Sequence, residues 1–163
     1  MKTLILYGTQ YGYTADCAGQ LTNLLEGETT LVDLTRQSTP DLAGYDAVII
    51  GGSIYMGKIQ ERVSGYCAAH AGELLQKRLG LFLCCGMPEN LQQSLEASFP
   101  EALREKAAAI GCFGGELRTG RMKPVHRLIA KMMEKATAKD GIKPPEANPQ
   151  AVKDFARAMA VAL

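Results

Sequence analysis

The stretch Thr9-Gln10-Tyr11-Gly12-Tyr13-Thr14 decides the fold, because it joins the apolar run at residues 3–7 to a predicted helix at residues 15–25. A turn between a strand and a helix start suits a phosphate group. Its threonine hydroxyls can donate, its glycine lets the backbone come close, and the first amides of the helix point at the anion. The turn contains no Lys or Arg. We therefore expect dipoles and neutral donors to hold the phosphate without an ion pair.

The same turn excludes two common nucleotide-binding motifs. A P-loop requires Lys and then Ser or Thr after its second glycine, whereas Gly12 is followed by Tyr13. The dinucleotide fingerprint requires three spaced glycines, which Gly8 and Gly12 do not supply. The alternative without a ligand is an ordinary strand-to-helix turn capped by a threonine.

The whole chain, residues 1–163, is predicted to form one domain in which strand and helix patterns alternate. Five apolar runs are continuous, which indicates strands that are buried on both faces. The alternation predicts an α/β fold, a three-layer sandwich around a parallel sheet in the order 2-1-3-4-5. The predicted strands are residues 3–7, 29–34, 47–51, 79–84 and 112–117, and the predicted helices are residues 15–25, 59–77, 91–110, 124–138 and 149–163, with Pro100 a candidate break in the third.

In this strand order a ligand lies beyond the carboxyl ends of strands one, three and four. The loops at residues 9–14, 52–58 and 85–90 meet at that edge of the sheet. We therefore expect these three loops to form the binding site. Residues 139–148 contain two prolines and are interpreted as a surface linker to the last helix.

Composition narrows the classes of function. The net charge of +1, with no basic tail, does not indicate nucleic-acid binding. No apolar run has the length of a membrane span and the first residues do not resemble a cleavable signal, so we expect a cytoplasmic protein. The five cysteines are odd in number and lack CxxC spacing, which disfavours a disulfide framework and a zinc site. The two histidines have no partner at a spacing typical of a hydrolytic triad.

Several segments together resemble the flavodoxin family. They are the opening strand, the turn at residues 9–14, the run Asp46-Ala47-Val48-Ile49-Ile50-Gly51, and the loop Ser53-Ile54-Tyr55-Met56-Gly57. The resemblance covers almost all of the chain. The chain departs from the family pattern at Tyr11, where flavodoxins commonly have a third Thr or Ser. The loss of that hydroxyl donor should weaken phosphate binding modestly.

The resemblance implies noncovalent FMN, with its phosphate on the first turn and its isoalloxazine ring between the second and third loops. It also implies that Tyr55 stacks on the ring and that the Met56–Gly57 peptide turns over with the redox state of the flavin, since glycine tolerates positive φ. No side chain need act as an acid or base, so no catalytic residue is predicted. The cofactor-binding residues implied are Thr9, Gln10, Tyr11, Gly12, Tyr13, Thr14, Ser53, Ile54, Tyr55, Met56, Gly57, Cys85, Gly86 and Met87.

Within the family, the chain is most similar to the flavodoxin-like protoporphyrinogen IX dehydrogenases. The similar segments are Met1-Lys2-Thr3-Leu4-Ile5-Leu6, the Ser53–Gly57 loop, and Gly115-Glu116-Leu117-Arg118 with the basic helix after it. This resemblance implies an oxidoreductase that passes electrons from a reduced organic substrate to an acceptor such as a quinone. The chain lacks the longer basic segment that these enzymes have after the fourth strand. The alternatives are an electron-transfer flavodoxin that serves redox partner proteins and, because of Tyr11, a flavin-free binding module.

The predicted helix at residues 124–138 is amphipathic. One interpretation is a helix that covers the core and has a solvated basic face. The other is a basic surface for an acidic partner, a substrate carboxylate or anionic lipid, which would place the protein at the inner face of the membrane. The apolar stripe consists of Val125, Leu128, Ile129, Met132, Met133 and Ala136, and the basic residues are Lys123, Arg127, Lys131 and Lys135.

Overall fold

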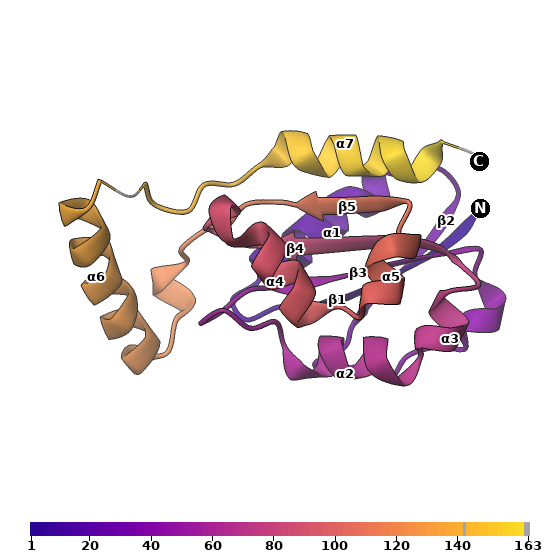
Figure 1. The fold of residues 1–163 in the computed structure, drawn as a ribbon, viewed down its shortest axis with the longest axis horizontal. Coiled ribbons are helices and arrows are strands. Elements are labelled where there is room, and N and C mark those ends of the chain that lie inside the picture. Colours follow the sequence, from indigo (N-terminus) through magenta and orange to yellow (C-terminus); the bar gives the residue numbers. More distant parts are fainter. Residues whose placement is uncertain (142, 162–163) are drawn as a thin grey trace.

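A five-stranded parallel sheet forms the centre of the molecule, in the order β2-β1-β3-β4-β5 (Figure 1). The computed structural model describes residues 1–141 and 143–161. The predicted fold class and strand order are confirmed. The strands are β1 (Lys2–Gly8), β2 (Glu28–Asp33), β3 (Ala47–Ser53), β4 (Arg78–Cys84) and β5 (Ala109–Cys112).

Helices cover both faces of the sheet, as the continuous apolar runs predict. Successive strand residues point to opposite faces. Leu4 and Leu6 therefore pack with one group of helices, while Ile5 packs with the other. The first group consists of α2 (Glu61–Ala69), α3 (Ala71–Leu74), α4 (Leu91–Ser98) and α5 (Glu101–Lys106), and the second consists of α1 (Tyr13–Leu24) and α7 (Pro149–Ala160).

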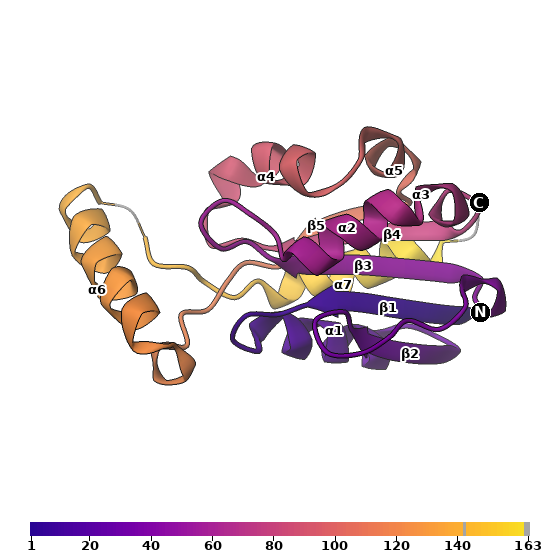
Figure 2. The ribbon, with the colours of Figure 1, turned by 90° about the horizontal axis from the view of Figure 1, so that it is seen from below.

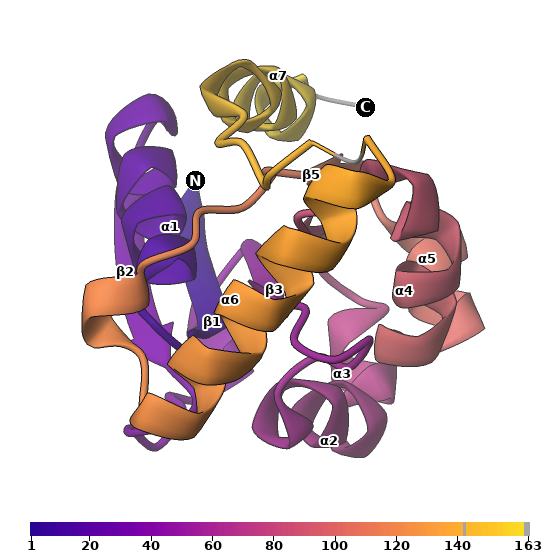
Figure 3. The same cartoon turned by 90° about the vertical axis from the view of Figure 1, so that its left-hand side faces the viewer.

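One helix, α6 (Pro124–Lys139), lies on neither face of the sheet. It stands beyond the carboxyl ends of the strands, joined to β5 and α7 by extended segments (Figure 2). Viewed toward those strand ends, α6 crosses in front of the sheet (Figure 3). Three short 3-10 turns lie in the connections, at Leu42–Gly44, Pro88–Asn90 and Thr119–Arg121.

The structure corrects the prediction of a fifth strand at residues 112–117. The paired residues are Ala109–Cys112, of which the prediction assigned the first two to the end of a helix and only Cys112 to the strand. The chain leaves the sheet at Gly114, whose φ of 73° is accessible mainly to glycine. Beyond it, the Gly115 amide donates to the carbonyl of Glu146 at 3.0 Å. Phe113 is buried and its amide still donates to the Leu83 carbonyl of β4 at 2.9 Å, but the chain beyond it turns away from the sheet.

Two long predicted helices are each divided. The helix at residues 91–110 breaks at Phe99, which is extended (φ −130°, ψ 138°) because it precedes a proline. The helix at residues 59–77 divides at His70, where φ is −111° and ψ is 17°. The last predicted helix, residues 149–163, ends at Ala160, and residues 162 and 163 lie outside the described residues.

Close packing at Gly51 gives a stability prediction. A Cβ atom at this position would collide with the buried ring of Phe82, which itself stacks on Phe113 with ring centroids 4.7 Å apart. We expect Gly51→Ala to lower the free energy of unfolding by about 1–3 kcal/mol, as overpacked cores do. Gly19→Ala is the matched control, since nothing lies within 4 Å of a Cβ there. Inside α1 it should raise stability by up to about 1 kcal/mol. Urea titrations that give the same change in the free energy of unfolding for Gly51→Ala and Gly19→Ala would contradict this packing.

Candidate functional site

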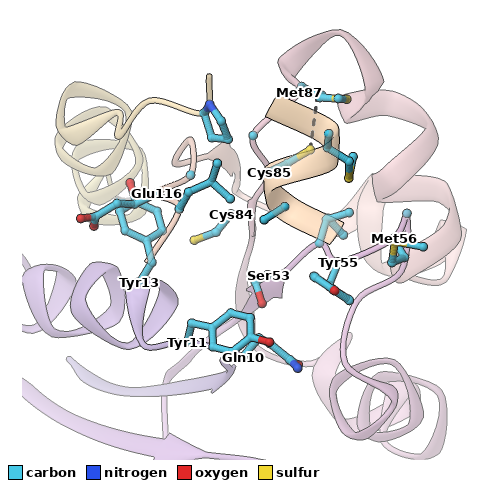
Figure 4. A pocket seen from close by; sticks show the side chains of 18 of the residues that line it. Gln10, Tyr11, Tyr13, Ser53, Tyr55, Met56, Cys84, Cys85, Met87 and Glu116 are labelled. Atoms are coloured by element: carbon cyan, nitrogen blue, oxygen red, sulfur yellow. Dashed lines mark hydrogen bonds between the residues drawn. The ribbon is translucent and has the colours of Figure 1, made fainter. Parts of the chain in front are cut away.

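A cavity of about 690 Å³ lies at the carboxyl edge of the sheet, between the strand-end loops and α6. In Figure 4, Tyr13 and Glu116 lie at one side of it and Met56 at the other, with Ser53 and Cys84 between them at the strand ends. The three predicted loops therefore meet at this cavity. Among the described residues, Gly12 is the only predicted site residue that does not line it. The predicted residues that line the cavity are Thr9, Gln10, Tyr11, Tyr13, Thr14, Ser53, Ile54, Tyr55, Met56, Gly57, Cys85, Gly86 and Met87.

The first turn presents an open helix start. Gly12 takes φ 95° at the N-cap of α1, and no side chain caps this helix. The hydroxyl of Thr9 instead accepts a hydrogen bond from the Gly12 amide at 2.9 Å. Thr14 is fully buried, and its hydroxyl has no hydrogen-bond partner among the described residues. The interpretation as a threonine-capped turn is therefore wrong, and the first amides of α1 remain available to an anion.

Two arginines from a distant segment lie against this turn. A Cβ atom placed on Gly12 would lie 2.7 Å from Nη1 of Arg121 and 3.1 Å from Nη1 of Arg118. The turn that we expected to hold a phosphate by neutral donors alone therefore has two cations beside it. The turn itself carries no charge, but the segment after β5 brings two guanidinium groups to it.

Arg118 is fixed in position by its neighbours. Its Nη2 donates to Asp16 at 2.5 Å and to Glu116 at 2.9 Å. Its guanidinium carbon lies 5.8 Å from the centre of the Tyr13 ring, within cation–π range. The hydrogen bond to Asp16 and, to a smaller extent, the bond to Glu116 raise the pKa of Arg118. This side chain therefore stays charged near neutral pH, and the two carboxylates orient it.

The second loop forms a tight turn under strain. The Tyr55 amide donates to the Lys58 carbonyl at 2.9 Å, and the Lys58 amide returns a bond of 3.1 Å. Met56 and Gly57 both have positive φ, 53° and 75°, which is typical of a type I′ turn. A methionine rarely adopts this conformation, and Met56 is 70% exposed. Such strain concentrates at functional sites, and Met56 lines the cavity.

The third loop contributes neutral groups. Cys84 and Cys85 are buried. The Cys85 thiol donates to the carbonyl of Met87 at 3.3 Å. Burial is the main cause that raises the pKa of Cys85. The pKa of Cys84 is also raised, first by its hydrogen bond with Cys17 and then by burial. These thiols are therefore protonated near neutral pH and act as small apolar groups.

Helix α6 closes the far side of the cavity. The Tyr11 hydroxyl is hydrogen-bonded to Nδ1 of His126. The Tyr55 ring lies against the same imidazole, with ring centroids 5.0 Å apart and planes tilted by 44°. His126 thus connects α6 to the first and second loops. Further along the helix, Ile129 and Met133 line the cavity.

The apolar stripe of α6 is divided between two sides. Ile129 and Met133 line the cavity, whereas Val125, Leu128 and Met132 are 67%, 61% and 63% exposed. The interpretation as a helix that covers the core is therefore wrong. Among residues 1–141 and 143–161, no helix has the length and hydropathy that a membrane crossing requires.

Comparison with known proteins identifies the family. The family model described as "Flavodoxin domain" matches residues 4–142. The chain belongs to the flavodoxin domain family. No curated protein matches it significantly in sequence.

Solved flavodoxin-like structures share the fold at low sequence identity. The Streptococcus pneumonia TIGR4 flavodoxin is 13% identical with a TM-score of 0.58, and 98% of each chain is covered. The WrbA-like flavodoxin of Agrobacterium tumefaciens is 16% identical with a TM-score of 0.54, covering 98% of this chain and 92% of that one. A Lactobacillus acidophilus NCFM flavoprotein in complex with FMN is 14% identical with a TM-score of 0.52, covering 67% of this chain and 91% of that one. These likenesses show the fold alone.

Sequence reasoning missed three side chains of this flavodoxin domain's site. They are Arg118, Arg121 and His126, each more than 100 positions beyond the first turn. In the sequence, Arg118 and Arg121 are only basic residues that precede the helix at 124–138, and His126 is a histidine with no partner at a triad spacing. These residues reach the first turn because the segment between β5 and α6 crosses the start of α1, and no sequence spacing predicts such a crossing.

The strained second loop gives a further prediction. Asn adopts the left-handed region more readily than other side chains do. Met56→Asn should therefore raise the free energy of unfolding by roughly 0.5–1 kcal/mol, a rise in Tm of about 2 °C for a domain of this size. Met132→Asn, in a regular helix and 63% exposed, is the control and should not raise Tm. If calorimetry finds no rise in Tm for Met56→Asn, the interpretation of this turn as strained is wrong.

Proposed function

We propose that this chain is an FMN-dependent oxidoreductase whose small organic partner binds beneath α6. The observation that carries the proposal is the position of α6, which closes the cavity on the side opposite the strand ends. A pocket that a helix covers on one side suits a small molecule, since such sites are concave and mainly apolar. A partner protein would require an open approach to the flavin.

The residues present fit FMN in two places. The open amides of α1, the Thr9 hydroxyl and the orphaned Thr14 hydroxyl suit its phosphate. Tyr55, Met56 and the backbone near Gly86 line the space where the flavodoxin family implies the ring. The FMN complex of the Lactobacillus flavoprotein supports this choice of cofactor at the level of the shared fold. When bound, FMN supplies the electron transfer, and the protein supplies binding, orientation and exclusion of water.

The chemistry of the lining favours an apolar, flat substrate. Leu117, Ile129 and Met133 face the cavity from the segments that cover it. His126 and Glu134 provide polar groups at the same wall. We infer a reduced organic substrate, a porphyrinogen being the candidate that the resembling segments favour, and a quinone as the electron acceptor.

The alternative is an electron carrier that serves redox partner proteins. It is favoured by the segment after β4, which carries Glu89, Glu96 and Glu101 and has no basic extension. The two functions differ in what reoxidises the reduced flavin: a small quinone that enters the cavity, or a protein that docks at its rim.

A matched pair of neighbouring methionines tests the enzyme function. Met133 lines the cavity, whereas Met132 points outward on the same helix. With a water-soluble quinone under anaerobic conditions, Met133→Lys should raise the KM for the quinone roughly tenfold, equivalent to about 1.4 kcal/mol, because a charge enters an apolar wall. Met132→Lys should leave the KM unchanged.

Stopped-flow reoxidation of the reduced holoprotein makes this measurement. Fast reoxidation by a protein acceptor, with no saturable reoxidation by quinones and no reduction of the oxidised holoprotein by protoporphyrinogen IX, would favour the carrier and contradict the enzyme. Equal KM values for the two lysine variants would also count against binding beneath α6.

We further propose that the outer face of α6 associates weakly with anionic lipid at the inner face of the membrane, where quinones are dissolved. This face exposes Val125, Leu128 and Met132 beside Lys131 and Lys135. Apolar side chains flanked by lysines are typical of helices that lie in a membrane surface.

Sedimentation with vesicles tests the lipid proposal. The wild-type protein should sediment with phosphatidylserine vesicles at low salt, and Lys131→Glu with Lys135→Glu should abolish this. Lys106→Glu with Lys153→Glu, which makes the same charge change on α5 and α7, should not. Failure of the wild-type protein to sediment would refute lipid association.

A further inference from the structure

The segment between β5 and α6 crosses the start of α1 and brings Arg118 and Arg121 to the first turn (Figure 3). The two guanidinium groups occupy the space that a side chain at position 12 would take, at 2.7 Å and 3.1 Å from a Cβ there. Glycine at this position therefore keeps the space open for them. The amides of the helix start and the two guanidinium groups share one small region.

The two arginines differ in their partners. Arg118 is paired with Asp16 and Glu116, and its side chain is 17% exposed. These two carboxylates would repel an anion on their own, but Arg118 bonds to both. Arg121 is exposed and makes no ion pair within the described residues, so its donors are available. Arg118 and its two carboxylates together carry one negative charge, which Arg121 balances. Arg121 is therefore the cation at the turn whose N–H groups are free for an anion.

A second, independent feature of the turn points to a missing polar ligand. Thr14 is fully buried and lines the cavity, yet its hydroxyl has no hydrogen-bond partner among the described residues. Buried polar groups are usually paired, so a hydroxyl that lines a cavity without a protein oxygen or nitrogen as partner is well placed to bind a polar ligand. The amides of the uncapped helix start require a partner as well.

We propose that Arg121, with Arg118 held beside it, binds the phosphate monoester of the flavin nucleotide at the first turn of α1. This inference rests on the proposed FMN function. A guanidinium presents its N–H groups in a planar fork that matches phosphate oxygens. The cation that the turn lacks thus comes from a position 109 residues further along the chain (121 − 12). The chain then discriminates strongly between phosphorylated and unphosphorylated flavin.

Titration of the apoprotein with FMN and with riboflavin, followed by flavin fluorescence, tests the inference. Arg121→Gln should raise the Kd for FMN roughly tenfold or more, the loss expected for a charge-assisted hydrogen bond. The Kd for riboflavin, which has no phosphate, should not change. Arg121→Lys, which keeps the charge, should retain part of the affinity for FMN. Inorganic phosphate should compete with FMN and not with riboflavin for the wild-type protein.

Arg157→Gln is the matched control. It removes the same charge from an exposed side chain on α7 and breaks only a surface pair with Asp154, so FMN affinity should be retained. An unchanged Kd for FMN in Arg121→Gln, or an equal loss for FMN and riboflavin, would overturn the inference while the FMN function stands. Failure of wild-type protein to bind either flavin would overturn both.

Discussion

The positive φ of Gly12 is the constraint on which the site depends. It lets the chain after β1 turn into α1 with no side chain capping the first amides of the helix. Any other residue would add backbone strain and a Cβ in the space that the two guanidinium groups occupy. The same turn places Tyr11 where its hydroxyl meets His126. The anion site and the attachment of α6 thus both follow from the path of the backbone over six residues.

The position of α6 separates this domain from a simple sheet with a ligand at its edge. A helix that stands beyond the strand ends has one side toward the cavity and another toward solvent, and its apolar residues are divided accordingly. In the proposed enzyme, its inner side restricts the substrate to molecules that fit an apolar chamber. In the proposed lipid association, its outer side supplies apolar and basic residues. The two proposals thus assign different roles to the two sides of one helix.

Much of the fold could be predicted from the sequence because β1, β3 and β4 are continuous apolar runs whose burial dominates their local behaviour. The fifth strand could not, since Ala109–Cys112 is short and the run after it, which contains the buried Phe113, leaves the sheet at Gly114. The three loops of the site followed from strand order alone. Arg118, Arg121 and His126 did not, because their positions depend on the path of an irregular segment that has no periodic signature.

A crystal structure of the chain with FMN tests the central claim most directly. The account predicts the phosphate on the amides at the start of α1, in contact with Arg121 and Thr14, and the isoalloxazine ring between the second and third loops beneath α6. A ring that lies at the open surface with α6 packed elsewhere, or a phosphate remote from Gly12, would contradict it.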